Sequence, residues 1–132
     1  MVMSGEMDLA VLLRSMEPVL DAAPYGYGVV PVGGVVPDGV FAVIAEAEGM
    51  TVVAAVDLLS LAGIAFDGQW ARISLTVHSA LAAVGLTAAI AAALAKQGIS
   101  ANVVAGFYHD HVFVQWARRA DAMAALNALR TA

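Results

Sequence analysis

The 132-residue chain contains no cysteine and few charged side chains, which make up 13% of its residues. The absence of cysteine excludes disulfides, thiolate metal sites and a cysteine nucleophile. Six Lys and Arg stand against eleven Asp and Glu, so the formal net charge is -5. Six basic side chains are too few for a surface that follows nucleic-acid phosphates. We therefore expect no nucleic-acid partner.

The sequence also lacks a hydrophobic run long enough to cross a bilayer, although its mean hydropathy is +0.83. The longest apolar run covers residues 80–95, which is shorter than the roughly 20 residues that a spanning helix needs. It lies in mid-chain, and Glu6 and Asp8 precede the first basic residue, Arg14; neither feature is typical of a signal peptide. We expect a cytoplasmic protein that makes no membrane contact.

Most of the hydrophobic residues are Ala and Val, which bury little area each. With so few charges to cover the surface, part of the apolar area is expected to face another chain. Composition alone therefore favours an oligomer, and we expect a homodimer.

The second half of the chain has the clearer periodicity. Residues 72–78 alternate strictly, with Ile73 and Leu75 on the inward side, as in a half-buried strand. Leu86, Ile90 and Leu94 then recur at helical spacing, and Gly98 follows at the position that ends many helices. The predicted order is strand 72–78, helix 84–97, strands 99–107 and 112–116 joined as a hairpin by residues 108–111, and helix 121–129.

The first half is predicted to contain a helix at 7–20 capped by Ser4, strands at 25–32, 41–47 and 50–54, and a helix at 55–61. The polar, turn-prone triplet Asp67-Gly68-Gln69 marks the best internal boundary, which gives halves at 1–67 and 68–132. The second half follows the β-α-β-β-α-β plan without its last strand, and the first half follows it without its opening strand. We expect a duplicated α+β, ferredoxin-like sandwich with antiparallel sheets, helices on one face, and strands shared between halves or between chains.

The residues at 73–79, 84–88, 98–104 and 108–114, with Ala47-Glu-Gly-Met-Thr-Val-Val53 in the first half, resemble a bacterial family of small tandem ACT-domain proteins. The arrangement is also similar to the paired ACT domains of the cytosolic arginine sensor. The resemblance implies a ferredoxin-like fold and a regulatory, non-enzymatic role. It further implies that an amino acid binds at an interface between two copies. The sequence departs from the family in residues 31–40, 54–56 and 69–72, which are more apolar and richer in glycine.

The first candidate site is the turn from strand to helix at residues 78–86. Gly85 lies near the first helical turn, where a ligand can approach the backbone, and the free N–H groups and the helix dipole there suit a carboxylate. The resemblance implies that this turn acts with the start of the next strand, where Asn102 offers a donor and an acceptor. The predicted ligand-binding residues are His78, Ser79, Val84, Gly85, Leu86, Asn102 and Val103. The alternative is structural: Ser79 caps the helix, Gly85 allows close packing and Asn102 pairs across the sheet.

Two other groups of residues could form a site, and each also has a simpler explanation. His109 and His111 lie two apart, which on a strand directs both rings to one face as in a metal site, but a polar hairpin turn around Asp110 explains them as well. Glu46 and Glu48 have the same spacing and could form a catalytic carboxylate pair, or simply lie in an exposed turn. We expect no metal, no cofactor and no enzymatic activity. A structural or interaction module without a metabolite is the alternative to an amino-acid-binding domain, and a small enzyme is a third possibility.

Overall fold

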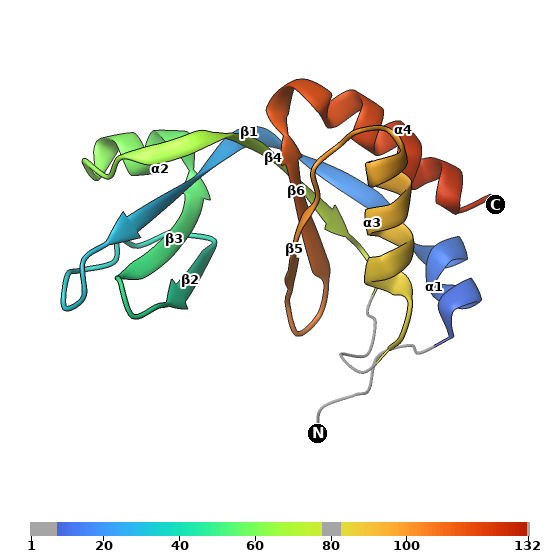
Figure 1. Ribbon diagram of the computed structural model, residues 1–132, viewed down its shortest axis with the longest axis horizontal. Coiled ribbons are helices and arrows are strands. Elements are labelled where there is room, and N and C mark those ends of the chain that lie inside the picture. The colour runs from blue at the N-terminus through green and yellow to red at the C-terminus, as the bar shows by residue number, and fades with distance from the viewer. Residues whose placement is uncertain (1–7, 78–82, 132) are drawn as a thin grey trace. The chain divides into compact units, whose positions relative to one another are not determined.

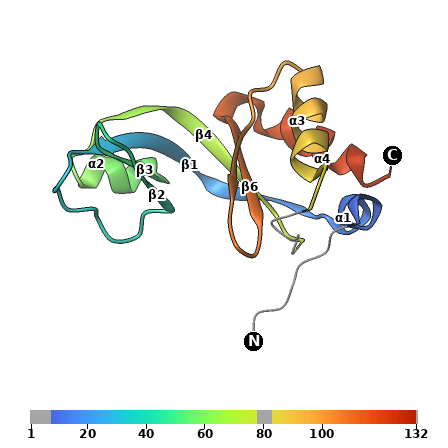
Figure 2. The same cartoon turned by 60° about the horizontal axis from the view of Figure 1, so that its bottom comes forward.

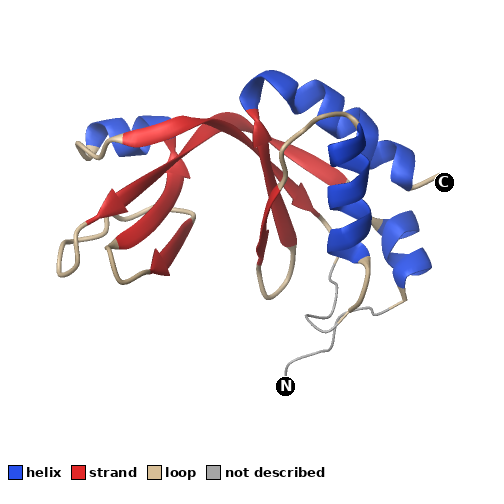
Figure 3. Ribbon diagram, viewed as in Figure 1, coloured by secondary structure: helices blue, strands red, loops and turns tan. Residues whose placement is uncertain are grey.

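The computed structural model describes residues 8–77 and 83–131. Along the chain (Figure 1) the elements are α1 (Leu9–Ser15), β1 (Pro18–Val30), β2 (Ala42–Ala45), β3 (Met50–Ala55), α2 (Val56–Leu61), β4 (Phe66–Leu75), α3 (Leu86–Lys96), β5 (Asn102–Ala105), β6 (Asp110–Gln115), the short 3-10 helix η1 (Trp116–Arg118) and α4 (Arg119–Leu129). Figure 3 separates these helices from the strands by colour. None of the helices described is long and apolar enough to cross a membrane.

The chain forms two compact units, and β1 and β4 contribute to both of them. Unit 1 combines the chain up to residue 21 with the chain from residue 71 onward, and unit 2 comprises residues 22–70. The strands follow the order β2-β3-β1-β4-β6-β5. Unit 2 therefore takes the order β2-β3-β1-β4, and unit 1 the order β1-β4-β6-β5. We expected strands to be shared between halves or between chains. In this structure the shared strands are β1 and β4, and both units that share them belong to one chain.

Helix α1 is shorter than the predicted helix 7–20. Its N-cap is Asp8, whose Oδ1 accepts hydrogen bonds from the backbone N–H groups of Ala10 (2.9 Å) and Val11 (3.2 Å). The predicted cap, Ser4, lies outside the described residues. The helix ends before Pro18, because a proline ring disfavours helical backbone in the residue that precedes it. Leu20, which was expected in the helix, lies in β1.

The predicted boundary at Asp67-Gly68-Gln69 is not a turn, since all three residues lie inside β4. Gly68 has a φ of +68°, and a Cβ atom there would come within 2.8 Å of Trp70 Nε1. The turn-prone residues therefore distort a strand without ending it. The division of the chain into halves at 1–67 and 68–132 stays a prediction.

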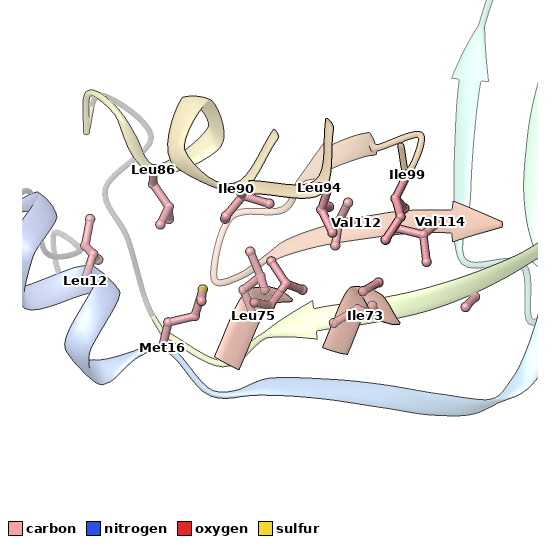
Figure 4. Packing of buried hydrophobic residues seen from close by; sticks show 13 residues of the cluster. Leu12, Met16, Ile73, Leu75, Leu86, Ile90, Leu94, Ile99, Val112 and Val114 are labelled. Atoms are coloured by element: carbon pink, nitrogen blue, oxygen red, sulfur yellow. The ribbon is translucent and has the colours of Figure 1, made fainter. Parts of the chain in front are cut away.

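The core of unit 1 confirms the predicted helical stripe and the strand alternation. Leu86, Ile90 and Leu94 are buried on α3 and point toward Ile73 and Leu75 of β4 (Figure 4). Buried residues of α1 and α4 join the same cluster, and Figure 2 shows α3 beside α4. The helices of unit 1 thus pack together on one face of its strands, as expected of a ferredoxin-like fold.

Helix α3 ends as the sequence predicts. Gly98 has a φ of +69°, its N–H donates to the carbonyl of Ala95 (2.9 Å), and the N–H of Ile99 donates to the carbonyl of Leu94 (3.0 Å). These two bonds form a Schellman motif, in which a left-handed glycine satisfies carbonyls that the helix leaves unpaired. Ile99 and Leu94 both belong to the core, so the end of the helix is held by packing as well.

The predicted hairpin is present as β5 and β6, but its link lies two residues earlier than expected. Asn102 pairs with Phe113 and Ala105 with Asp110, so the connection runs through residues 106–109. The N–H of Gly106 donates to the carbonyl of His109 (2.9 Å), and a Cβ atom on Gly106 would come within 2.7 Å of that oxygen. Glycine at this position therefore lets the backbone approach the His109 carbonyl in this turn.

Unit 2 has a smaller core, formed where α2 packs against its strands. The buried cluster consists of Val30, Val52, Ala54 and Leu59. The first half was expected to lack its opening strand, yet unit 2 contains four strands, and β1 supplies the first of them. Where the ferredoxin-like plan has its first helix, residues 31–41 connect β1 to β2 without one.

A matched pair of leucine substitutions tests the assignment of the main core. Because Leu94 is fully buried, Leu94→Ala should lower the free energy of unfolding by about 2–5 kcal/mol. Leu61 is 92% exposed on α2, and Leu61→Ala should change it by less than about 0.5 kcal/mol. Urea denaturation followed by circular dichroism measures both. Equal losses in the two variants would contradict the packing described.

Candidate functional site

Gly85 forms the turn that leads into α3. It is the N-cap residue, with φ of 102° and ψ of -19°, a left-handed conformation that L side chains rarely adopt. A Cβ atom there would lie 3.0 Å from Leu9 Cδ2, so the side of this glycine faces α1. Both the backbone conformation and the contact with Leu9 explain why glycine is needed. They agree with the structural alternative given for Gly85, namely that it allows close packing.

The start of α3 also offers backbone donors. Its N-cap, Gly85, has no side chain to cap this end, and the N–H groups of the first turn have no partner within the helix. Val84, just before the turn, is 83% exposed, whereas the Leu86 side chain is buried in the core. Leu86 can therefore contribute its backbone N–H but not its side chain. His78 and Ser79, the other predicted residues of this turn, lie outside the described residues.

Asn102 and Val103 lie at the other end of α3. The helix has 11 residues, which at 1.5 Å per residue separates its two ends by about 16 Å, and β5 begins only after its C-terminal end. Figure 4 shows Leu86 and Ile99 at opposite ends of the packed row. One copy of the chain therefore does not bring Gly85 and Asn102 together.

The two β5 residues also face different sides of the sheet. Val103 pairs with the buried Val112 and packs against the core, whereas Asn102 pairs with Phe113 and is exposed. Asn102 can thus reach a ligand from solvent, and Val103 serves the interior.

His111 and Ser74 form a polar pair between β6 and β4. Ser74 Oγ lies 2.8 Å from His111 Nδ1. Burial, followed by the positive charge of Arg72 and by His109, holds the pKa of His111 below its ordinary value of 6.5. The pair is therefore built around a neutral imidazole near neutral pH.

Of the three residues from His109 to His111, which offered either a polar turn or a metal site, only His109 lies in the turn. Asp110 and His111 lie in β6, and Asp110 is buried. Because neighbouring residues of a strand point to opposite faces, Asp110 does not share a face with His111. Across the described residues, no three His, Cys, Asp or Glu side chains are placed to hold one metal ion.

Glu46 and Glu48 lie in the turn between β2 and β3. Glu46 and Gly49 exchange backbone hydrogen bonds of 3.0 and 3.3 Å, and the hydroxyl of Thr51 donates to the Glu46 carboxylate. Both glutamates are exposed. This arrangement matches the exposed-turn interpretation and does not assemble a catalytic pair.

Sequence reasoning missed a groove between the outer faces of α3 and α4. It has a volume of about 830 Å³ and is lined by Ala89, Ala92, Ala93, Ala95, Lys96, Gln97, Ala125, Ala128 and Leu129. The signal was present in the sequence, because alanines recur three and four residues apart on both helices. From the sequence, the many alanines stood out only as a feature of the overall composition. They form one surface because α3 and α4 pack against each other, and that contact is visible only in the structure.

Comparison with known proteins gives a consistent set of relatives. Two models described as ACT domain match residues 66–128 and 4–69. Among proteins with curated descriptions, none matches this sequence. A solved protein of unknown function from Vibrio cholerae, described as a possible transport protein, is 43% identical over 96% of this chain and 99% of its own, with a TM-score of 0.81.

More distant solved structures share the fold. A protein from Agrobacterium tumefaciens is 16% identical over 87% of this chain and 89% of its own, with a TM-score of 0.72. The ligand-free regulatory subunit of aspartate kinase from Thermus thermophilus is 12% identical over 89% of this chain and 98% of its own, with a TM-score of 0.59.

Two glycines allow the causes of strain at the turn to be separated. Gly85 and Gly98 both have positive φ, but only Gly85 has a neighbour, Leu9, near the position of a Cβ atom. Gly98→Ala should destabilise the protein by about 1–2 kcal/mol from backbone strain alone. Gly85→Ala should cost more, and adding Leu9→Ala should recover the difference in Gly85→Ala but not in Gly98→Ala. Chemical denaturation of the single and double variants measures this, and no recovery would refute the contact.

The environment of His111 predicts how stability varies with pH. Its pKa is lowered in the folded protein relative to 6.5, so the unfolded chain binds the proton more readily and stability falls as pH drops below about 6.5. Between about pH 7.5 and about pH 5.5, which bracket the ordinary histidine pKa, the wild type should lose more stability than His111→Gln. Urea titrations at the two pH values test this, and equal losses would exclude His111 as a source.

Proposed function

The chain belongs to the ACT-domain family of regulatory proteins, and we propose that it binds an amino acid without catalysing a reaction. The observation that carries the proposal is the start of α3. It is a helix end whose N-cap residue, Gly85, has no side chain to cap it, with the exposed Val84 beside it. Such an end attracts a carboxylate through its free N–H groups and its partial positive charge.

The ammonium group of the ligand requires a second element, and we propose that Asn102 of another copy supplies it. Within one chain the two elements are separated by about the length of α3, roughly 16 Å. Asn102 is exposed and its amide carries both a donor and an acceptor. A homodimer that places the β5 start of one copy beside the α3 start of its partner completes the site. This geometry also agrees with the resemblance, which implies ligands held between two copies.

A thermal-shift screen against the twenty amino acids tests the proposal. A ligand that binds only the folded protein raises its melting temperature, so at least one amino acid should do so at millimolar concentration. Asn102→Ala should abolish the shift while leaving the unliganded melting temperature unchanged, because the side chain is exposed. Asn127→Ala on α4 is the matched control and should retain the shift. If no amino acid gives a shift, the ligand proposal fails.

A second candidate is an interaction module that binds no metabolite. The groove between α3 and α4 favours it, because an open apolar surface lined by alanine is suited to close packing against another chain. Size-exclusion chromatography does not separate the two functions, since both involve a dimer. A dimer that persists while the amino-acid screen is negative would favour this second candidate.

A further inference from the structure

The net negative charge of the protein comes from unit 2. Residues 22–70 contain five acidic side chains and no Lys, Arg or His, whereas the rest of the chain has equal numbers of acidic residues and of Lys and Arg. The net charge of -5 for the whole chain is therefore the charge of unit 2. The acidic residues are Asp38, Glu46, Glu48, Asp57 and Asp67.

Unit 2 also presents a strand edge. In the strand order β2 is terminal, and among the described strands it pairs only with β3. Glu46 and Gly49 exchange both of their backbone hydrogen bonds. Because hydrogen-bonded and non-hydrogen-bonded pairs alternate along an antiparallel ladder, the N–H and C=O groups of Ala45 and Val43 point away from β3. These groups are available to another strand.

The side chains around this edge are apolar and exposed. On β2, Val43 and Ile44 are 45% and 47% exposed, and Val29 on β1 is 59% exposed. Ile44 and Val29 are both paired with Thr51 of β3, so the three form one row across the strands. Thr51 donates its hydroxyl to Glu46, which places a carboxylate beside the row. Apolar contact and negative charge thus occur together.

We propose that β2 is a docking edge for an extended segment of a partner protein in which Lys or Arg alternate with apolar residues. Addition of a strand supplies backbone hydrogen bonds, and the side chains on either face supply specificity. The absence of basic residues from unit 2 favours a cationic partner and disfavours pairing of β2 with β2 of a second copy, since like charges would face each other. The surface does not depend on the proposed amino-acid site.

Binding of two synthetic peptides to the full-length protein tests this inference. Isothermal titration calorimetry should show binding of a short peptide in which Val and Lys alternate, and no binding of its Val and Glu counterpart. The affinity should fall as salt is added, because the attraction is between exposed charges. Binding of both peptides with equal affinity, or of neither, would overturn the proposal.

Substitutions locate the binding on β2. Val43→Pro removes an N–H that points outward and leaves the bonds to β3 intact, so the affinity for the Lys peptide should fall about tenfold with an unchanged circular dichroism spectrum. Unchanged affinity would show that the peptide binds elsewhere. A change from dimer to monomer in this variant, measured by size-exclusion chromatography against the wild type, would instead make the edge a contact between copies, which also overturns the proposal.

Charge variants keep the inference testable even if Val43→Pro fails to fold. Combining Glu46→Gln with Glu48→Gln removes the two carboxylates beside β2 and should weaken binding of the Lys peptide and reduce its salt dependence. Combining Asp57→Asn on α2 with Asp67→Asn on β4 removes the same number of carboxylates at exposed positions away from β2, so it is the control for a general loss of negative charge and should bind almost as the wild type does. Equal weakening by both changes would mean that only net charge matters, and the docking edge would be rejected.

Discussion

The fold depends on the pairing of β1 with β4, two strands long enough to serve both compact units. β1 has 13 residues and β4 has 10, and each unit reaches four strands only by including part of each. A slip of one residue in such a long pair would move every side chain to the wrong face. In unit 2, Gly26 and Gly28 of β1 lie where residues near the start of β4 come too close for any side chain, so these two positions of β1 must be glycine. A Cβ atom on Gly26 would be 2.9 Å from Phe66, and one on Gly28 would be 2.7 Å from Ile64.

The sequence correctly predicted those helices and strands in which the spacing of apolar residues itself shows which face is buried. The stripe of Leu86, Ile90 and Leu94 and the alternation at Ile73 and Leu75 were confirmed for that reason. The triplet 67–69 was wrongly expected to form a turn because turn propensity is local, whereas pairing with neighbouring strands holds those residues in β4. The link of the hairpin was predicted two residues too late, because Asp110 and His111 are polar and look like turn residues although they lie within a paired strand.

The candidate site, too, was predictable from the sequence in part. Gly85 was identifiable from the chain itself, since a glycine between a strand and an apolar helical stripe indicates a special backbone conformation. The distance between Gly85 and Asn102 follows from the length of α3, so two positions that are neighbours in the interpretation of the sequence lie apart in one copy. The β2 edge became visible only when the strand order was known. The acidic residues of unit 2 can be counted in the sequence. That they belong to one compact unit without basic residues is known only from the division of the chain after residues 21 and 70.

The shared strands also bear on how such a protein changes over evolutionary time. In most tandem proteins a whole repeat can be gained, lost or exchanged by one recombination event between two genes. Here the coding sequence of unit 1 flanks that of unit 2, and each breakpoint would fall inside β1 or β4. Deleting or replacing one unit would therefore also sever two strands of the other. The two units are consequently inherited as a single genetic module, and they can diverge in charge but cannot separate.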